Sequence, residues 1–176
     1  MQVRYAAVSV WLHWLMLLLF IGAYATIELR VQFPKGSEER DFIKTAHYLL
    51  GLSIFVLVWL RIIARLVTNT PTRENYGRWQ QWASKLMFLA LYALMIFMPL
   101  LGWTIVSGEG QQIQIFNWSL PALIEANKDT AHLAEEIHET FGTVGYFLIG
   151  LHSVAALTHH FFKKDNTLKR MLRFKD

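Results

Sequence analysis

The feature of this sequence that most restricts its fold is a set of four long stretches without charge. Three of them hold 22 or 23 residues, over 5–27, 86–107 and 140–162. The fourth is uncharged for 16 residues, over 45–60, and continues apolar past Arg61. A helix needs about 20 apolar residues to cross the core of a bilayer. The helices of a soluble bundle would each need a polar stripe, which these stretches lack. The sequence therefore predicts four membrane spans.

The expected fold is all-α: an integral membrane four-helix bundle in a single domain over residues 1–176. Its composition, 54% hydrophobic, exceeds that of an ordinary soluble domain. The expected spans are about 6–28, 43–67, 84–107 and 137–162.

Lysine and arginine placement predicts the orientation of the bundle. The N terminus, the 61–85 stretch and the tail after residue 162 hold 12 of the 17 basic residues against 3 acids, whereas the other side holds 5 against 10. Because basic residues stay on the cytoplasmic side, both termini are expected there. The net charge of +4 is thus a topology signal, and we expect no nucleic-acid binding. The absence of cysteine excludes disulfides, thiolate metal sites and the covalent attachment of a c-type haem.

Six of the seven histidines lie in or at the ends of the expected spans. A single one could simply hydrogen-bond a neighbouring helix, but polar groups are costly in lipid and usually face the bundle interior. His138 and His152 are 14 residues apart, which places them ~21 Å apart on one face of a helix. This spacing suits two stacked haems, one in each half of the bilayer.

Depth in the membrane selects the partners of these two histidines. His13 comes early in a span that runs outward, so it is level with His152, and His47 at the outer start of its span is level with His138. The predicted pairs are His13–His152 on an inner haem iron and His47–His138 on an outer one. Zinc is the rival occupant, but it requires four converging ligands. Two imidazoles per iron leave no open coordination site, which indicates electron transfer.

Further residues on the same faces are candidates for a supporting role. Gly51 and Gly142 each follow a ligand by four residues and would give a flat macrocycle clearance, although glycine also serves close helix packing. Arg61 and Arg65 share the helix face of His47 and could pair with propionates of the inner haem, or simply snorkel to the interface.

A second site is predicted at the cytoplasmic end of the last span. His159 lies seven residues after His152 and could hydrogen-bond a quinone carbonyl and carry its proton. Arg78 and Trp79 could complete that pocket.

Several segments together resemble the bacterial cytochrome b561 family over nearly the whole chain: WLHWLMLLLFIGAY, KTAHYLLGLSIFVLVWLRIIAR, LALYALMIFMPLLGW and EIHETFGTVGYFLIGLHSVAALTHHFFKKDNTLKRML. The resemblance implies two haem b groups held by His13, His47, His138 and His152, with quinone near His159. It is closest to a member that passes electrons from periplasmic superoxide to ubiquinone. Many members carry a histidine where this chain has Phe88.

Two functions are expected from these features, and a third is open. The first is a superoxide:quinone oxidoreductase. The acidic outer face opposes this reading unless some of its basic residues form a local positive patch: Arg30, Lys35, Arg40, Lys44 or Lys128. The second is a cytochrome b relay or anchor subunit between quinone and a partner dehydrogenase or periplasmic redox protein. The third is a histidine-rich membrane protein without a cofactor.

Overall fold

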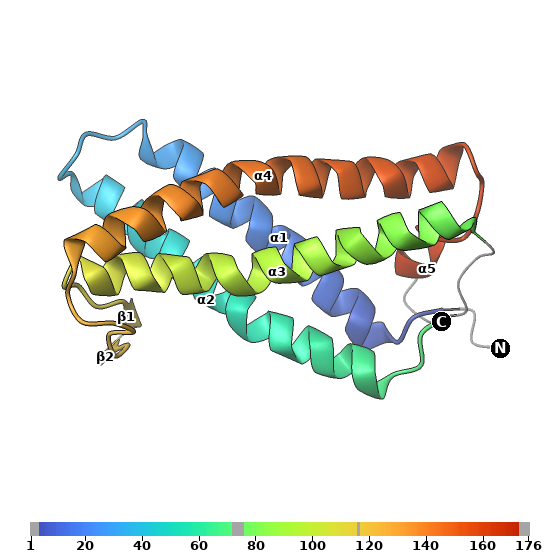
Figure 1. Ribbon diagram of the computed structural model, residues 1–176, viewed down its shortest axis with the longest axis horizontal. Coiled ribbons are helices and arrows are strands. Elements are labelled where there is room, and N and C mark those ends of the chain that lie inside the picture. Colours follow the sequence, from blue (N-terminus) through green and yellow to red (C-terminus); the bar gives the residue numbers. More distant parts are fainter. Residues whose placement is uncertain (1–3, 72–75, 116, 173–176) are drawn as a thin grey trace.

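The computed structural model describes residues 4–71, 76–115 and 117–172 of the chain, and Figure 1 shows their arrangement. The long elements are four helices: α1 (Ala7–Arg30), α2 (Glu38–Val67), α3 (Arg78–Gly108) and α4 (Lys128–Phe161). A two-stranded antiparallel hairpin, β1 (Gln114–Ile115) and β2 (Trp118–Ser119), follows α3, and a short helix, α5 (Lys169–Leu172), follows α4.

The helices extend beyond the uncharged stretches where polar residues can cap or continue them. Ser37 begins α2 by accepting a hydrogen bond from the backbone N–H of Arg40, and acidic residues fill the first turn, where they interact favourably with the helix dipole. Asn127 caps α4 in the same way, through the N–H of Thr130. As a result α4 begins nine residues before the span expected at 137, and α3 begins six residues before the span expected at 84.

The outer surface of the bundle is apolar along the four long helices. Leu18, Leu89 and Phe147 are 65%, 67% and 74% exposed, although each lies in the middle of a helix. All four long helices are long and apolar enough to cross a membrane. An apolar surface of this extent would not stay exposed to water, so the structure is a four-helix membrane bundle and not a soluble one.

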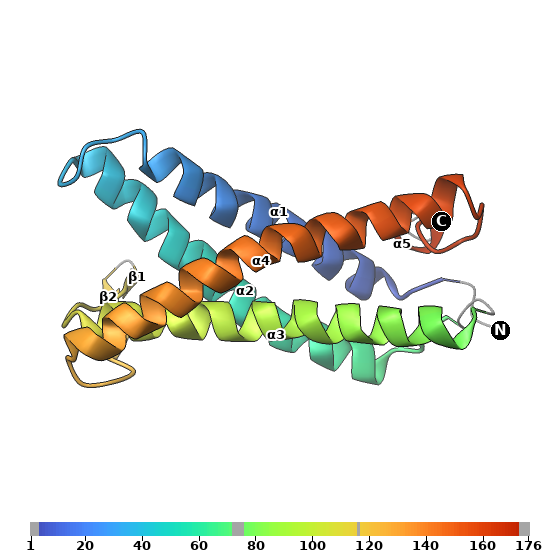
Figure 2. The same ribbon diagram turned by 45° about the horizontal axis from the view of Figure 1, so that its top comes forward.

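The bundle consists of two helical hairpins joined through α2 and α3. Helix α1 packs on α2, α3 packs on α4, and α2 packs on α3 around Met16, Ile54, Val58 and Met95. Helix α4 crosses α1 at an angle, as the two views in Figures 1 and 2 show. Ring side chains make much of the contact between α1 and α4, including the Tyr24 and Tyr146 rings, whose centroids are 4.1 Å apart. Of the histidine pairs described below, His13–His152 joins α1 to α4 and His47–His138 joins α2 to α4.

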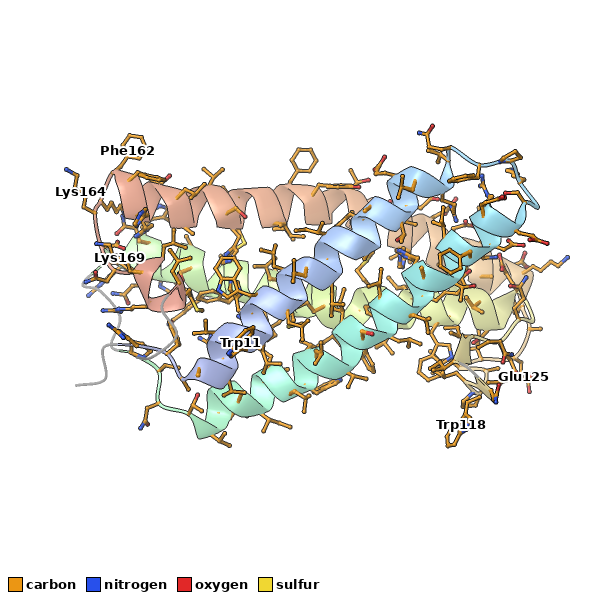
Figure 3. All side chains as sticks on the ribbon, turned by 180° about the vertical axis from the view of Figure 1, so that it is seen from behind. Trp11, Trp118, Glu125, Phe162, Lys164 and Lys169 are labelled. Carbon is orange, nitrogen blue, oxygen red and sulfur yellow. The ribbon has the colours of Figure 1, made fainter. Side chains whose placement is uncertain are left out.

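The two ends of the bundle differ in charge. The start of α1 and the short helix α5 lie at the same end (Figure 1), where Figure 3 shows Lys164 and Lys169, while Trp118 and Glu125 lie at the opposite end. We refer below to the end with α5 as the basic end and to the other as the hairpin end. At the basic end, a hydrogen bond of 2.7 Å from the Trp14 indole N–H to the Met171 carbonyl joins α1 to α5.

Candidate haem and quinone sites

His13 of α1 and His152 of α4 meet in the half of the bundle nearer the basic end. Their ring centroids are 6.3 Å apart, and the two ring planes are inclined by 75°. Both residues are partly buried. Phe88 of α3 lies beside this pair, with its ring centroid 6.4 Å from that of His152. The structure thus brings together the first pair that membrane depth predicts.

His47 of α2 and His138 of α4 meet in the other half of the bundle with nearly the same geometry. Their ring centroids are 6.2 Å apart and their planes are inclined by 72°. One member of each pair therefore comes from the α1–α2 hairpin and the other from α4. Within the described part of the chain, no third His, Cys, Asp or Glu joins either pair to make a cluster of metal ligands.

The spacing of both pairs fits a haem iron with two axial imidazoles. One ring nitrogen from each imidazole on a shared iron, at about 2 Å per bond, would hold the two rings at about this separation. The observed values are 6.3 Å and 6.2 Å. The donor set and its geometry therefore fit haem.

His47 of the outer pair also has the supporting contact that a metal-bound imidazole needs. Nδ1 of His47 lies 3.1 Å from the Ala23 carbonyl oxygen, which can only accept, so the ring hydrogen is on Nδ1 and the lone pair is on Nε2. Nδ1 of His138, near the backbone of Met98, is buried without a hydrogen-bond partner in the described part of the chain, so this support is shown for His47 alone. Backbone carbonyls that fix the second ring nitrogen are the usual partners of ligating histidines.

The glycines one turn from the outer pair leave open space. A Cβ atom at Gly51 would meet nothing within 4 Å, and one at Gly142 would meet only the terminal methyl of Met98 at 3.7 Å. Close helix packing therefore does not explain Gly51. The clearance is available to a flat ligand beside His47 and His138.

Arginines with unsatisfied nitrogens accompany both pairs. Arg61 of α2 approaches Nδ1 of His13 at 3.4 Å, which is long for a hydrogen bond, and its second terminal nitrogen is buried without a hydrogen-bond partner. Arg30 of α1 lies near His47, and its Nε is likewise buried without a partner. Each α1–α2 histidine thus has an arginine from the other helix of the hairpin. Sequence reasoning missed this role for Arg30, which it assigned only to the outer positive patch.

Arg65 and the outer basic residues have other contacts. Arg65 lies over the Phe88 ring, with 5.4 Å from its guanidinium carbon to the ring centroid. Arg40 donates to the carbonyls of Arg30 and Phe33, at 3.2 Å and 2.9 Å. Arg40 therefore holds the backbone of the turn after α1, whereas Arg30 is the basic residue that lies near His47.

His159 lies at the basic end in a network of four polar side chains that come from three places in the chain. Its Nδ1 is 2.5 Å from Oδ2 of Asp165, and the hydroxyl of Tyr76 donates to the same oxygen at 3.0 Å. Thr167 contacts the Tyr76 hydroxyl at 2.8 Å. We call His159, Tyr76, Asp165 and Thr167 the His159 cluster. Tyr76, Asp165 and Thr167 were missed by sequence reasoning, although the last two lie in KDNT, within the fourth segment that resembles the cytochrome b561 family.

The residues expected to complete a quinone pocket lie close to the His159 cluster but not within it. Arg78 and Trp79 begin α3 two and three residues after Tyr76, and both are exposed. Their part in a pocket stays a prediction. Partial burial alone would raise the pKa of Asp165, but hydrogen bonds from Thr167, His159 and Tyr76 outweigh it and hold that pKa well below its ordinary value.

The fold and these sites define the class of protein: a multi-pass helical membrane protein with two pairs of intramembrane histidines. Residues 4–174 match the family described as prokaryotic cytochrome b561, and the chain belongs to this family. It is therefore a membrane electron-transfer protein of the cytochrome b561 type, a family whose cofactor is haem b.

Named relatives align over nearly their whole length. "Cytochrome b561 homolog 1" of Escherichia coli is 35% identical over 170 residues, which is 96% of this chain and 97% of that protein. "Probable superoxide oxidase CybB" of Yersinia pestis is 33% identical over 183 residues, covering 98% and 97%. "Cytochrome b561 homolog 2" of Escherichia coli is 28% identical over 171 residues, covering 96% and 91%.

Proposed function

We propose that this protein is a di-haem b superoxide oxidase that passes electrons from periplasmic superoxide to ubiquinone. The observation that carries the proposal is the equal spacing of the two histidine pairs, 6.3 Å and 6.2 Å, at two depths of one bundle. Two haems, when bound, supply a path for single electrons across the bilayer. His13 and His152 would hold the inner haem, and His47 and His138 the outer one.

Arginines would hold the propionate groups of the two haems. A propionate carboxylate accepts two hydrogen bonds from one guanidinium, and the buried unpartnered nitrogens of Arg61 and Arg30 offer such donors. The guanidinium of Arg61 can only donate, so its long contact with Nδ1 of His13 is a poor substitute for a carboxylate. Arg65 would contribute positive charge to the inner site across Phe88.

Chemistry on the two faces must balance in electrons and protons. Two superoxide ions each give up one electron and leave as O2, and one quinone takes up two electrons and two protons to become quinol. His159, at the basic end, would hydrogen-bond a quinone carbonyl and supply protons from that side of the membrane. The placement of basic residues predicts that this side is cytoplasmic. The similarity to a relative named as a probable superoxide oxidase supports superoxide as the electron donor.

The second candidate function is a relay subunit that receives electrons from a partner protein. One observation favours it: the acids expected on the outer face outnumber the bases by 10 to 5, which repels a superoxide anion. The charge of Arg30, which lies near His47, opposes that repulsion beside the outer pair. The charge beside the outer pair, and not the average of the face, governs the approach of a small anion, so we favour the oxidase.

The test is a purified preparation examined in two steps. The first step counts haem per chain and records the reduced-minus-oxidised spectrum, for which we expect two low-spin haems. The second mixes the oxidised protein with superoxide alone and follows haem reduction, which we expect at close to the diffusion limit. Slow reduction by superoxide, together with a co-purifying redox partner, would establish the relay. A colourless preparation from haem-replete cells would refute both.

A further inference from the structure

The His159 cluster is a built site and not an accidental contact of surface residues. The side chains of His159 and Asp165 are only 19% and 14% exposed, although both lie beyond or at the end of α4. Both oxygens of the Asp165 carboxylate are used: Oδ1 accepts from the backbone N–H of Thr167 at 2.8 Å, and Oδ2 faces Tyr76 and His159. The chain also closes back on itself, because the backbone N–H of Asp165 donates to the His159 carbonyl at 3.2 Å.

We propose that Asp165 is a positioning residue for quinone reduction, which holds the Nδ1–H of His159 and leaves its Nε2–H to donate to the quinone carbonyl. This inference rests on the proposed function and deepens it. A carboxylate that accepts from one ring nitrogen fixes the tautomer and orientation of the imidazole, and it stabilises the positively charged form. The pKa of Asp165 is held well below its ordinary value, so the carboxylate is negative at physiological pH.

The proton step follows from this arrangement. As quinone accepts an electron, the Nε2–H bond of His159 breaks and an O–H bond forms on the quinone oxygen. The imidazole becomes neutral but keeps its Nδ1–H on Asp165, so the ring does not turn. Nε2 then regains a proton from cytoplasmic water, and the second electron and proton follow in the same way. The electrons come from the donor on the opposite face, so no further reductant is needed.

Tyr76 and Thr167 keep the carboxylate in place. The Tyr76 hydroxyl bridges Asp165 and Thr167, and its ring packs edge-on against the His159 ring with centroids 5.0 Å apart. Lys163 lies over the Tyr76 ring, with its Nζ 5.5 Å from the ring centroid. The other charged groups at this end of the described chain are all basic: Arg4, Arg61, Arg65, Arg78, Lys85, Lys164, Lys169 and Arg170. Asp165 is therefore the acid that balances the protonated imidazole.

The experiment uses the full-length protein with both haems, reduced anaerobically with dithionite and mixed with a water-soluble ubiquinone analogue. The variant is Asp165→Asn, which keeps the shape and loses the charge. We expect unchanged haem spectra, a quinone KM within about twofold, and a maximal rate lowered by about 10–100-fold, because one supported acid is weakened.

Three comparisons make the outcome decisive. Asp165→Glu keeps the charge, so it should restore most of the rate. In a His159→Gln background, Asp165→Asn should cause no further loss, because both act on one proton. Asp129→Asn makes the same chemical change at the far end of α4 and should leave the rate unchanged.

An unchanged rate in Asp165→Asn, a raised KM alone, or additive losses in the double variant would overturn the inference. If the Asp165→Asn protein fails to retain haem, the Asp165→Glu protein becomes the deciding variant. A quinone-reduction rate for Asp165→Glu as low as that of His159→Gln would then overturn the inference. A parent protein whose reduced haems are not oxidised by quinone at all would instead refute the proposed function.

Discussion

Replacing Arg61 with leucine should lower the midpoint potential of the inner haem alone. A positive charge near the iron stabilises the reduced state, because that state carries one positive charge fewer. Arg61 lies 3.4 Å from Nδ1 of His13. Adding about 4 Å from Nδ1 through the ring to the iron gives a charge–iron distance of ~7 Å.

The expected size follows from this distance. At an effective dielectric constant of about 20, a unit charge ~7 Å away contributes ~2.4 kcal/mol. Since about 2.3 kcal/mol corresponds to 100 mV for one electron, full loss of the charge corresponds to ~100 mV. Water and counter-charges at the partly buried site screen part of it, so we expect a fall of about 50–100 mV.

The assay is a spectroelectrochemical titration of the parent and Arg61→Leu proteins, each with two haems. One of the two transitions should move to lower potential and the other should stay. Arg61→Lys keeps the charge and should shift the potential by less than about 30 mV. Arg65→Leu is the matched control, because Arg65 contacts the pair only across Phe88, and its shift should be smaller. An unchanged potential, or an equal shift of both transitions, would refute the assignment of Arg61 to the inner haem.

Three further predictions concern haem binding and packing. His47→Ala should reduce haem from two to one per chain, measured as haemochrome against protein concentration. Gly51→Leu fills space that is open beside His47, so it should lower haem occupancy without lowering the helix content seen by circular dichroism. Gly108→Val should instead destabilise the fold by about 1–3 kcal/mol, seen as a lower thermal unfolding midpoint, because a Cβ there lies 2.9 Å from that of Ala131.

The pairing of the histidines was predictable because helix rise and span direction fix depth. His13 meets His152, and His47 meets His138, as the counting of residues along each span requires. The four-helix fold followed equally directly, since uncharged stretches of this length have few stable arrangements. The ends of the helices did not follow, because α3 and α4 continue through polar residues that hydropathy assigns to loops.

The supporting residues were harder to predict because their roles depend on chain turns and side-chain direction. Arg30 and Lys35 look alike in the sequence as outer basic residues, but only the fold brings Arg30 to His47. Asp165 reaches His159 because the chain reverses after Phe162, and Lys164 adopts a left-handed backbone conformation with φ of 54° in that turn. Local sequence gives little warning of such a reversal at a lysine.

The division of the bundle into two hairpins has a consequence for biogenesis. The α1–α2 hairpin supplies His13 and His47, and α4 supplies His138 and His152, so neither pair exists until the second hairpin has entered the membrane. If both pairs hold haem as proposed, complete sites would form only after α4 has been inserted, late in translation. The connection between residues 67 and 78 is also the natural place to divide the gene, since two co-expressed halves would each bring one ligand to every pair.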